Sequence, residues 1–406
     1  MSLSIVRKLQ IFLPFAFGYF LSYLYRVINV VPAPNLVADI GLEPAELGLL
    51  TSTYFITFAA FQLPLGVLLD RFGPRKIESA LLLVGASGAL TFAYAESMTG
   101  LIIGRALIGL GVSACLMAAF KAFVIWFPTR QLPRINGFQM AMGGLGALAG
   151  TTPVEIALSF TDWRGVFKVL AILTLAVAVA IFFIVPERKM EKRDLSLSDQ
   201  IRGIGLVFKN PTFWRIAPWT TFSQTTYLSI QGLWAGPWLR DVVGMDRTAV
   251  AETLMWVAVA MIAGFISLGT VAERLSRGGI PPMTVGACGM FLFMVQLLLL
   301  ILEPVPWAAL VMVLFGFFGT SGILPYAVLS QSFPSHLSGR VNTALNLLVF
   351  FAAFSAQWGI GAIIGQWPVN ETGGYSPNGY RVAFSFMLGL QGLTFLWFLF
   401  PRRRSK

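Results

Sequence analysis

Stretches of about twenty consecutive apolar residues recur along the whole chain, and this feature constrains the fold most. A helix needs about 20 apolar residues to cross the roughly 30 Å hydrocarbon core of a bilayer. In lipid every backbone polar group needs a partner inside the protein, so such stretches must be helical. The sequence therefore predicts an all-α polytopic membrane protein with twelve spans: 11–32, 47–69, 77–95, 99–126, 135–158, 165–185, 214–239, 250–271, 282–302, 306–331, 341–366 and 380–400.

The composition and the distribution of charge agree with a membrane protein. Only 12% of the 406 residues are charged, compared with about 25% in soluble domains. The net charge is +11, but most of the Lys and Arg residues fall in loops on the side of the N-terminus. Because such residues stay in the cytoplasm, we expect both termini there, in a bacterial inner membrane, and no nucleic-acid partner. On the opposite side lie Arg164, Lys168, Arg240, Arg247 and Arg381.

Several kinds of chemistry are not indicated by the sequence. Cys115 and Cys288 fall in spans 4 and 9, and the single histidine, His336, falls in a loop. This pattern predicts neither a disulfide framework nor a zinc site. No GxxxxGK[ST] motif for binding nucleotide phosphates occurs, and no nucleophile stands beside a base. We therefore expect no cofactor, no metal and no enzymatic activity.

The chain divides into two halves that share a weak repeat. The segment "GVLLDR" at 66–71 returns as "GTVAER" at 269–274, and "FPTRQLPRIN" at 127–136 returns as "FPSHLSGRVN" at 333–342. The offsets, 203 and 206 residues, are about half the chain. Duplicated halves around a site at the bilayer midplane are typical of secondary transporters. We predict six-helix bundles at 1–185 and 214–406, joined by a cytoplasmic linker at 186–213 that contains an amphipathic helix.

One loop motif resembles a known family signature. "GVLLDRFGPRK" at 66–76 is similar to the signature between spans 2 and 3 of the major facilitator superfamily. The resemblance implies two pseudo-symmetric six-helix bundles that alternate access to a central site, and we expect a monomer. It also implies a conformational latch between this loop and the start of span 11, formed by Gly66, Asp70, Arg71, Gly73, Arg75, Lys76 and Arg340. The alternative is that these bases are ordinary cytoplasmic charges.

The first span carries an arginine on a polar face. At helical spacing Tyr19, Ser22, Tyr23, Arg26 and Asn29 share one side. Arginine inside a membrane is costly unless it faces water, a partner or a ligand. The segment resembles span 1 of the organophosphate:phosphate antiporter branch, where this arginine binds phosphate, and also of the anion:cation symporter branch. The antiporter branch has a second arginine in span 7, where this chain has Ser229. The alternative is that Arg26 snorkels to the interface.

A second cation, Lys121 in span 4, is a candidate helper for Arg26. Glu155 is the only carboxylate that we place inside a span. This excess of positive charge predicts an anionic substrate, most simply a carboxylate. Lys121 also fits a structural pair or a snorkelling side chain.

Glu155 and Arg105 are the candidates for proton coupling. A carboxylate in a span can carry a proton, but Glu155 also fits an ion pair with Arg26 or a solvated helix end. Arg105 equally fits a structural pair within the first bundle. Fallback proton sites near the outer ends are Asp39, Asp246 and Glu252.

The second half offers polar and aromatic candidates for the substrate site. Glycines in "GFFGTSGILP" at 316–325 predict a bend in span 10, or close packing. The candidate substrate-binding residues of this half are Gln224, Gln231, Trp234, Tyr326, Asn342 and Asn346.

These features together predict a secondary active transporter for a small organic anion, with protons moving in symport. The alternative is a proton-driven efflux antiporter for drugs or metabolites. The order Gly150-Thr151-Thr152-Pro153 in span 5 departs from the pattern of drug antiporters, which counts against efflux.

Overall fold

The computed structural model describes residues 4–128, 132–187, 197–303, 305–334, 337–369 and 373–400, and every regular element in them is helical. His336 and the side chain of Asp70 lie outside the described residues. The first half contains α1 (Ile5–Val27), the 3₁₀ turn η1 (Ile28–Val30), α2 (Ala33–Ile40), α3 (Pro44–Phe72), α4 (Pro74–Ala93), α5 (Met98–Gly111), α6 (Cys115–Trp126), α7 (Leu132–Ala149), α8 (Thr152–Leu158) and α9 (Trp163–Ile184).

The second half follows the linker helix α10 (Leu197–Phe208). It contains α11 (Pro211–Ser229), the π turn η3 (Ile230–Trp234), α12 (Ala235–Asp241), α13 (Arg247–Arg277), α14 (Pro282–Ile301), the 3₁₀ turn η4 (Val305–Trp307), α15 (Ala308–Gly319), the 3₁₀ turn η5 (Thr320–Ile323), α16 (Leu324–Gln331), α17 (Ser338–Ile364) and α18 (Pro377–Leu399).

Helices occupy all twelve regions where spans were predicted. Among the described residues, ten segments are long and apolar enough to cross a membrane. The other two predicted spans are interrupted. Span 5 divides into α7 and α8 at Gly150 and Thr151, and span 7 is made of α11, η3 and α12.

Further breaks fall at related places in the two halves. Residues 112–114 separate α5 from α6, and η5 separates α15 from α16. The repeat offset of about 206 residues relates these breaks. The bend predicted from the glycines of span 10 therefore lies at η5.

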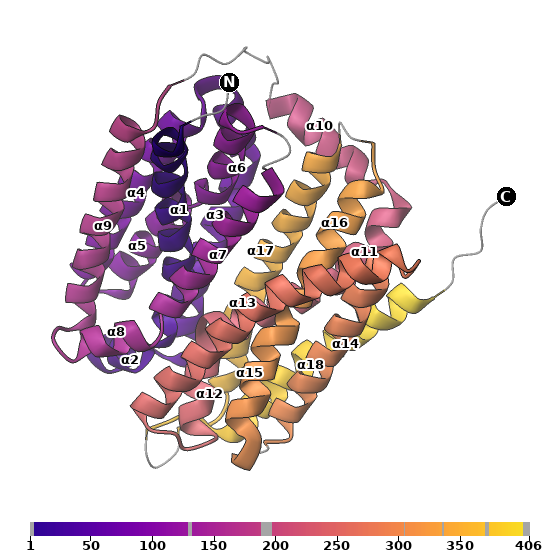
Figure 1. Cartoon of the computed structure of the whole chain (residues 1–406). Coiled ribbons are helices and arrows are strands. Elements are labelled where there is room, and N and C mark those ends of the chain that lie inside the picture. Colours follow the sequence, from indigo (N-terminus) through magenta and orange to yellow (C-terminus); the bar gives the residue numbers. More distant parts are fainter. Residues whose placement is uncertain are drawn as a thin grey trace.

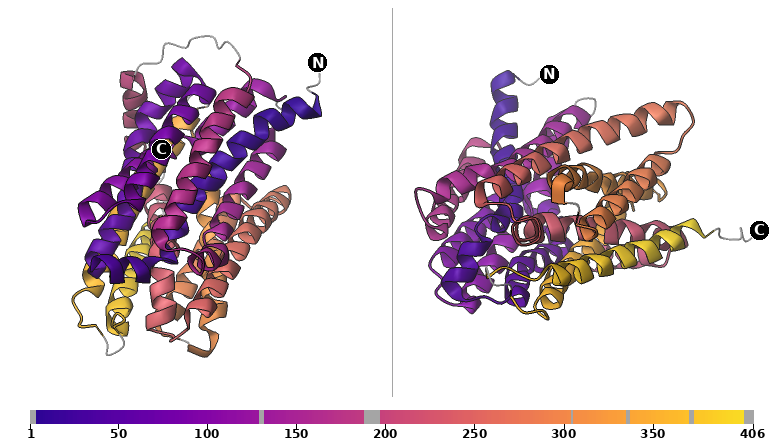
Figure 2. Two further views of the ribbon diagram at one scale, coloured as in Figure 1. Left: turned by 90° about the vertical axis from the view of Figure 1, so that its left-hand side faces the viewer. Right: turned by 90° about the horizontal axis from the view of Figure 1, so that it is seen from below.

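The two halves stand side by side, the first in indigo to magenta and the second in orange to yellow (Figure 1). A view from below shows the same separation (Figure 2). We call the end at which α10 lies the linker end, and the other end, with α2 and α8, the α8 end. The linker helix packs on α17 and α3, with Ile204 and Val207 buried, whereas Ile201 is exposed.

The halves meet along a seam of helices. α3 packs along α17, α13 packs on α7 and α8, and η1 contacts η3. Gly48 and Gly361 allow α3 and α17 to approach closely: a Cβ on Gly48 would lie 2.7 Å from the carbonyl oxygen of Gln357, and one on Gly361 would lie 2.3 Å from that of Pro44. Both contacts are nearer the α8 end, so the halves are tightly joined there.

Candidate functional site

Arg26, in the last turn of α1, lies among aromatic rings from both halves. Its guanidinium carbon is 4.7 Å from the ring centre of Tyr23, 5.5 Å from that of Phe58 in α3 and 5.6 Å from that of Phe350 in α17. Cations over ring faces at such distances are attracted by the ring quadrupole. Arg26 therefore lies at the seam between the halves.

Arg26 is not neutralised by an acid. Within the described residues it has no ion pair with a carboxylate, and its Nε is buried without a hydrogen-bond partner. The phenols of Tyr23 and Tyr54 are near enough to act on its charge. A partly buried cation with an unused donor is suited to bind an anion.

The structure places Tyr19 and Tyr23, two residues of the predicted polar face of α1, next to each other. Tyr19 and Tyr23 pack edge to face at 5.9 Å and direct their hydroxyls to Met140 in α7 and Met261 in α13. Gln231 of η3 also donates to the sulfur of Met261, at 3.6 Å. Tyr19, Tyr23 and Gln231 thus lie together beside Arg26.

Two buried amides near the seam have unused hydrogen-bonding atoms. Asn29 donates to Thr51 at 3.3 Å, but its Oδ1 has no partner. Neither amide atom of Gln357 in α17 has a partner, although the side chain is fully buried. Most buried polar groups in proteins are satisfied, so these atoms are candidates to contact a ligand. Gln357 was missed in the sequence because an unpartnered amide is visible only in tertiary structure.

The asparagines of α17 follow the same helix face as Phe350. Asn342, Asn346 and Phe350 are spaced four residues apart, and side chains at this spacing lie above one another. Oδ1 of Asn342 is buried without a partner. This row leads from the linker end towards Arg26.

Other predicted binding residues make contacts inside the second half. Gln224 donates to the carbonyl of Gly319 at 3.1 Å, and Trp234 donates to that of Gln357 at 3.1 Å. Tyr326 is half-buried in α16, where the charge of Arg26 acts on its phenol. Gln224 and Trp234 therefore hold helices together, and Tyr326 is nearer to the site.

Lys121 is not brought beside Arg26. A Cβ on Gly18 would lie 3.8 Å from Sγ of Cys115. Gly18 of α1 and Cys115 of α6 are therefore at about the same height along the bundle axis. Arg26 is eight residues from Gly18 towards the α8 end, and Lys121 is six residues from Cys115 towards the linker end. At 1.5 Å per residue the two cations are roughly 20 Å apart along the bundle. Lys121, which is half-buried and engaged in its own contacts, is too far away to help Arg26.

Arg105 links helices within the first half. It is fully buried, donates from Nη1 to the carbonyl of Tyr25 at 2.9 Å and lies 5.4 Å from the ring centre of Tyr54. These contacts favour its structural interpretation.

Glu155 pairs across the seam, with Arg247 instead of Arg26. Its Oε1 lies 2.6 Å from Nε of Arg247 at the start of α13. Arg247 also donates to Asn35 in α2, at 2.9 Å. Three elements at the α8 end, α8, α13 and α2, are thereby joined. Glu252, a fallback proton site, is exposed on α13.

Glu155 is not the only carboxylate inside a span, and that expectation is wrong. Glu78 lies in α4, within the span Pro74–Ala93, and is fully buried. The sequence signal was present, since Glu78 falls inside the predicted span 77–95. Its proximity to the basic loop 66–76 made it resemble one more charge of the linker end.

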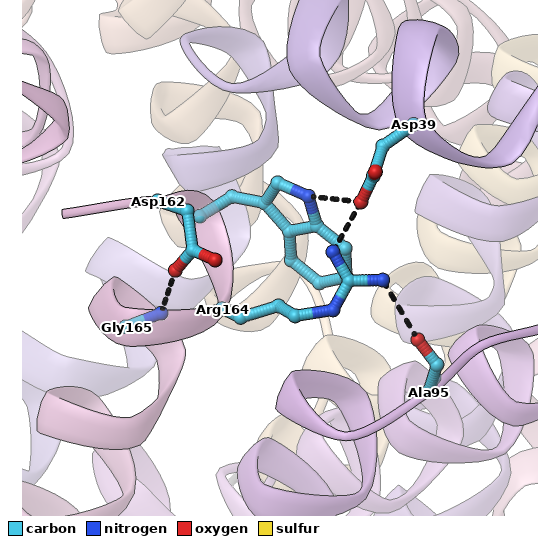
Figure 3. A network of polar contacts seen from close by, with 6 residues as sticks. Asp39, Ala95, Asp162, Arg164 and Gly165 are labelled. Carbon is cyan, nitrogen blue, oxygen red and sulfur yellow. Dashed lines mark hydrogen bonds and ion pairs between the residues drawn. The ribbon is translucent and has the colours of Figure 1, made fainter.

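The remaining acids at the α8 end are satisfied locally. Asp39 accepts hydrogen bonds from Arg164 and Trp163, as Figure 3 shows, and Arg164 also donates to the carbonyl of Ala95. These bonds, first that from Arg164, hold the pKa of Asp39 below its usual value. Asp246 accepts from the backbone of Ala249 as the N-cap of α13. The lowered pKa of Asp39 does not favour a role as a proton carrier near neutral pH.

A cavity of about 640 Å³ opens between α2 and α12 at the α8 end. Its lining includes Arg240, Asp241 and Tyr375. Asp241 already accepts from Nε of Arg240 at 2.6 Å, the hydroxyl of Tyr380 at 2.9 Å and the backbone of Tyr375 at 3.1 Å. The polar groups in the wall of this cavity therefore bind one another within the second half.

The bases of the predicted latch contact other partners in this conformation. Nζ of Lys76 lies 2.5 Å from Glu187, and Nη1 of Arg75 lies 3.8 Å from it, which holds the pKa of Glu187 below its usual value. Arg71 lies over the ring of Phe72 at 5.3 Å. Arg340 lies against Gly203 of α10: a Cβ built on Gly203 would lie 2.3 Å from Cδ of Arg340.

Gly73 has φ 82°, a conformation that glycine adopts readily, and closes the turn between α3 and α4. Gly66 lies within α3.

Comparisons with known proteins agree on one family. The model of the Major Facilitator Superfamily matches residues 15–357. A probable sulfoacetate transporter of Cupriavidus necator is 25% identical and covers 68% of this chain and 69% of its own length. A probable L-galactonate transporter of Escherichia coli is 23% identical and covers 66% of this chain and 62% of its own length. The structure of a bacterial homologue of the human lysosomal transporter Spinster, inward-facing and unoccupied, has a TM-score of 0.78 at 16% identity, covering 98% of this chain and 97% of that one.

Proposed function

The chain belongs to the major facilitator superfamily, and we propose that it carries a small organic anion, most simply a carboxylate, by proton-coupled symport. As a member of this family it is a multi-pass membrane transporter and not an enzyme. The observation that carries the proposal is Arg26: a guanidinium at the seam of the halves with a buried, unused Nε and, among the residues that the structure describes, no acidic partner. A carboxylate accepts readily from such a group.

The names of the relatives support an anionic substrate. Sulfoacetate and L-galactonate are both organic anions, although the identities of 25% and 23% do not carry either compound to this chain. The substrate site then consists of Arg26 with Tyr19, Tyr23, Gln231 and Gln357. Asn342 and Asn346 line the approach from the linker end.

The direction of access follows from charge and packing. Lys and Arg gather at the linker end, which we place in the cytoplasm of a bacterial inner membrane. The α8 end is joined by the pair of Glu155 and Arg247 and by the contact of η1 with η3. Alternating access would require the pair of Glu155 and Arg247 and the contact of η1 with η3 to separate, so that Arg26 could be reached from the α8 end.

Ligand-induced thermal stabilisation of the purified protein tests this function. A ligand that binds the folded protein raises its melting temperature by mass action. We expect small carboxylates to stabilise the wild type and not Arg26→Ala, with Arg26→Lys retaining part of the effect. Arg277→Ala, which removes an exposed arginine, is the control and should respond like the wild type. Equal stabilisation of the wild type and Arg26→Ala by lipophilic cations would contradict the proposal and favour efflux.

A further inference from the structure

The carboxyl group of Glu78 is a buried acid that the substrate site does not use. The side chain is fully buried in α4, and among the described residues the only group close enough to donate to its carboxyl oxygens is the weak donor of the Cys115 thiol, which does not reach ordinary hydrogen-bond geometry. Its neighbour in sequence, Ser79, donates to the carbonyl of Ala178 in α9, six residues before that helix ends. At 1.5 Å per residue this places the carboxyl roughly 9 Å inside the linker end of α9.

Two residues of other helices enclose this carboxyl. A Cβ built on Gly18 of α1 would lie 2.3 Å from Oε1 of Glu78 and 3.8 Å from Sγ of Cys115 in α6. A larger residue at this position would force the carboxyl of Glu78 to move. Cys115, which is itself fully buried, is the titratable group that acts on Glu78.

The charged groups of the surrounding helices are directed elsewhere. On α4 itself, Arg75 and Lys76 pair with Glu187. On α5, Arg105 binds the carbonyl of Tyr25. The remaining charged or phenolic groups on the packed helices contact other residues or lie at helix ends. They are Arg7, Lys8, Tyr19, Tyr23, Tyr25 and Arg26 on α1, Glu46, Tyr54 and Arg71 on α3, Lys121 on α6, and Arg164 and Lys168 on α9.

An ionised carboxylate without a partner is strongly unfavourable in such a place, whereas the neutral acid is tolerated. We propose that Glu78 is a proton-binding site that holds the neutral acid in this conformation and releases the proton when α1 moves. This inference rests on the proposed symport, since it names the group that would carry the coupled proton. The chemistry is a single protonation of a carboxylate oxygen and needs no other reactant.

The position of Gly18 explains how the proton and the substrate would be linked. Gly18 and Arg26 lie on the same helix, eight residues or about two turns apart. A movement of α1 on binding an anion at Arg26 changes the space between Gly18 and Glu78. Water that entered this space would solvate the carboxylate and favour loss of the proton.

Infrared difference spectroscopy of the purified protein tests the proton site directly. We expect the wild type to show the C=O band of a protonated carboxyl group near neutral pH and Glu78→Gln to lack it. Glu96→Gln, which alters an exposed acid beyond the other end of α4, should keep the band. Cys115→Ser should shift the band, so the assignment can be made even if Glu78→Gln does not fold. A wild-type spectrum without this band would overturn the proposal.

Transport in proteoliposomes separates the proton site from substrate binding. Glu78→Gln should exchange a labelled carboxylate across the membrane as the wild type does but should fail to accumulate it under a proton gradient. Accumulation equal to that of the wild type, with the same pH dependence, would exclude Glu78 as the coupling site. If the wild type exchanged no carboxylate at all, the proposed function would fail, and the infrared band would still decide whether Glu78 binds a proton.

Discussion

Oε1 of Glu155 lies 2.6 Å from Nε of Arg247, and the two residues belong to different halves of the molecule. The pair has to break when the α8 end opens. Glu155 was predicted to pair with Arg26 or to carry a proton, but its partner makes it part of the closure of this end. Its strength is limited because 46% of the Arg247 side chain is exposed.

Glu155→Gln should shift the protein towards conformations that are open at the α8 end. Exposed pairs contribute about 1 kcal/mol or less, so we expect at most about a fivefold change in population. Accessibility can be measured with a cysteine introduced at Ala33, which lies in the wall of the cavity at this end, in a protein whose exposed Cys288 is replaced by Ser. This cysteine should react faster with an impermeant maleimide when Glu155→Gln is present than when Glu155 is intact. Glu273→Gln breaks an exposed pair within α13 and should leave the rate unchanged. Equal rates in both variants would show that the pair does not hold the closure.

Phe350→Ala should weaken substrate binding. The ring lies 5.6 Å from the Arg26 guanidinium, and such a contact contributes about 0.5–2 kcal/mol. We expect the apparent affinity in uptake assays to fall by about 2- to 30-fold. The next residue, Phe351, is 60% exposed, so Phe351→Ala should transport normally. A larger loss for Phe351→Ala than for Phe350→Ala would argue against the aromatic cluster.

Gln357→Met should separate stability from function. Unpaired buried polar atoms cost about 1–3 kcal/mol each, and the methionine removes two of them at similar volume. We expect an equal or higher melting temperature together with reduced transport. Gln296 in α14 also has a buried, unpaired Oε1, and Gln296→Met should keep full transport. Normal transport by Gln357→Met would remove this amide from the substrate site.

Gly146→Ala should destabilise the packing of α7 on α1. A Cβ there would lie 2.2 Å from the carbonyl oxygen of Phe20, which is backbone and cannot rotate away. Overpacking of this kind costs about 1–3 kcal/mol. Gly389→Ala in α18, where nothing lies within 4 Å, is the control for thermal unfolding. Similar melting temperatures for the two variants would contradict the packing described for α1 and α7.

Asp39→Asn should lower thermal stability in a manner that depends on pH. Hydrogen bonds, first from Arg164, lower the pKa of Asp39 in the folded protein, relative to about 3.9 when unfolded. The stabilisation is therefore present above about pH 4 and is lost as the pH falls through the lowered pKa. The difference in melting temperature between Asp39→Asn and the wild type should be constant from about pH 5 to pH 8 and shrink below about pH 4. It should be small, because 45% of the side chain is exposed. A difference that grew on acidification would contradict this sign.

Much of the fold could be predicted because lipid imposes a simple requirement. A span must be long, apolar and helical, and all twelve predicted regions are helical in the structure. The interruptions were harder to predict. The glycines at 316, 319 and 322 indicated a bend that the structure places at η5, but the sequence of η3 gave no comparable sign of a π turn.

The site could be predicted only where helix periodicity was sufficient. Helix periodicity predicted that Tyr19, Tyr23 and Arg26 share one face of α1, and these three side chains lie together in the structure, because their spacing is determined by one helix. Lys121 was misplaced because sequence gives the face of a residue but not its depth relative to another helix. Glu78 was overlooked because it lies close to the basic loop 66–76, although it falls inside a predicted span. The unpaired amide of Gln357 could not be predicted, because the absence of a partner is a property of the packed molecule.

The contact between η1 and η3 has a mechanical consequence. A π turn contains one residue more than α-helical spacing requires. When such an extra residue moves by one position, the helix beyond it rotates by about 100° while remaining helical. In η3 this rotation would withdraw Trp234 from the carbonyl of Gln357. If the proposed transport cycle separates η1 from η3, a slip of hydrogen-bond register within η3 would be sufficient, and no loop would need to act as a hinge.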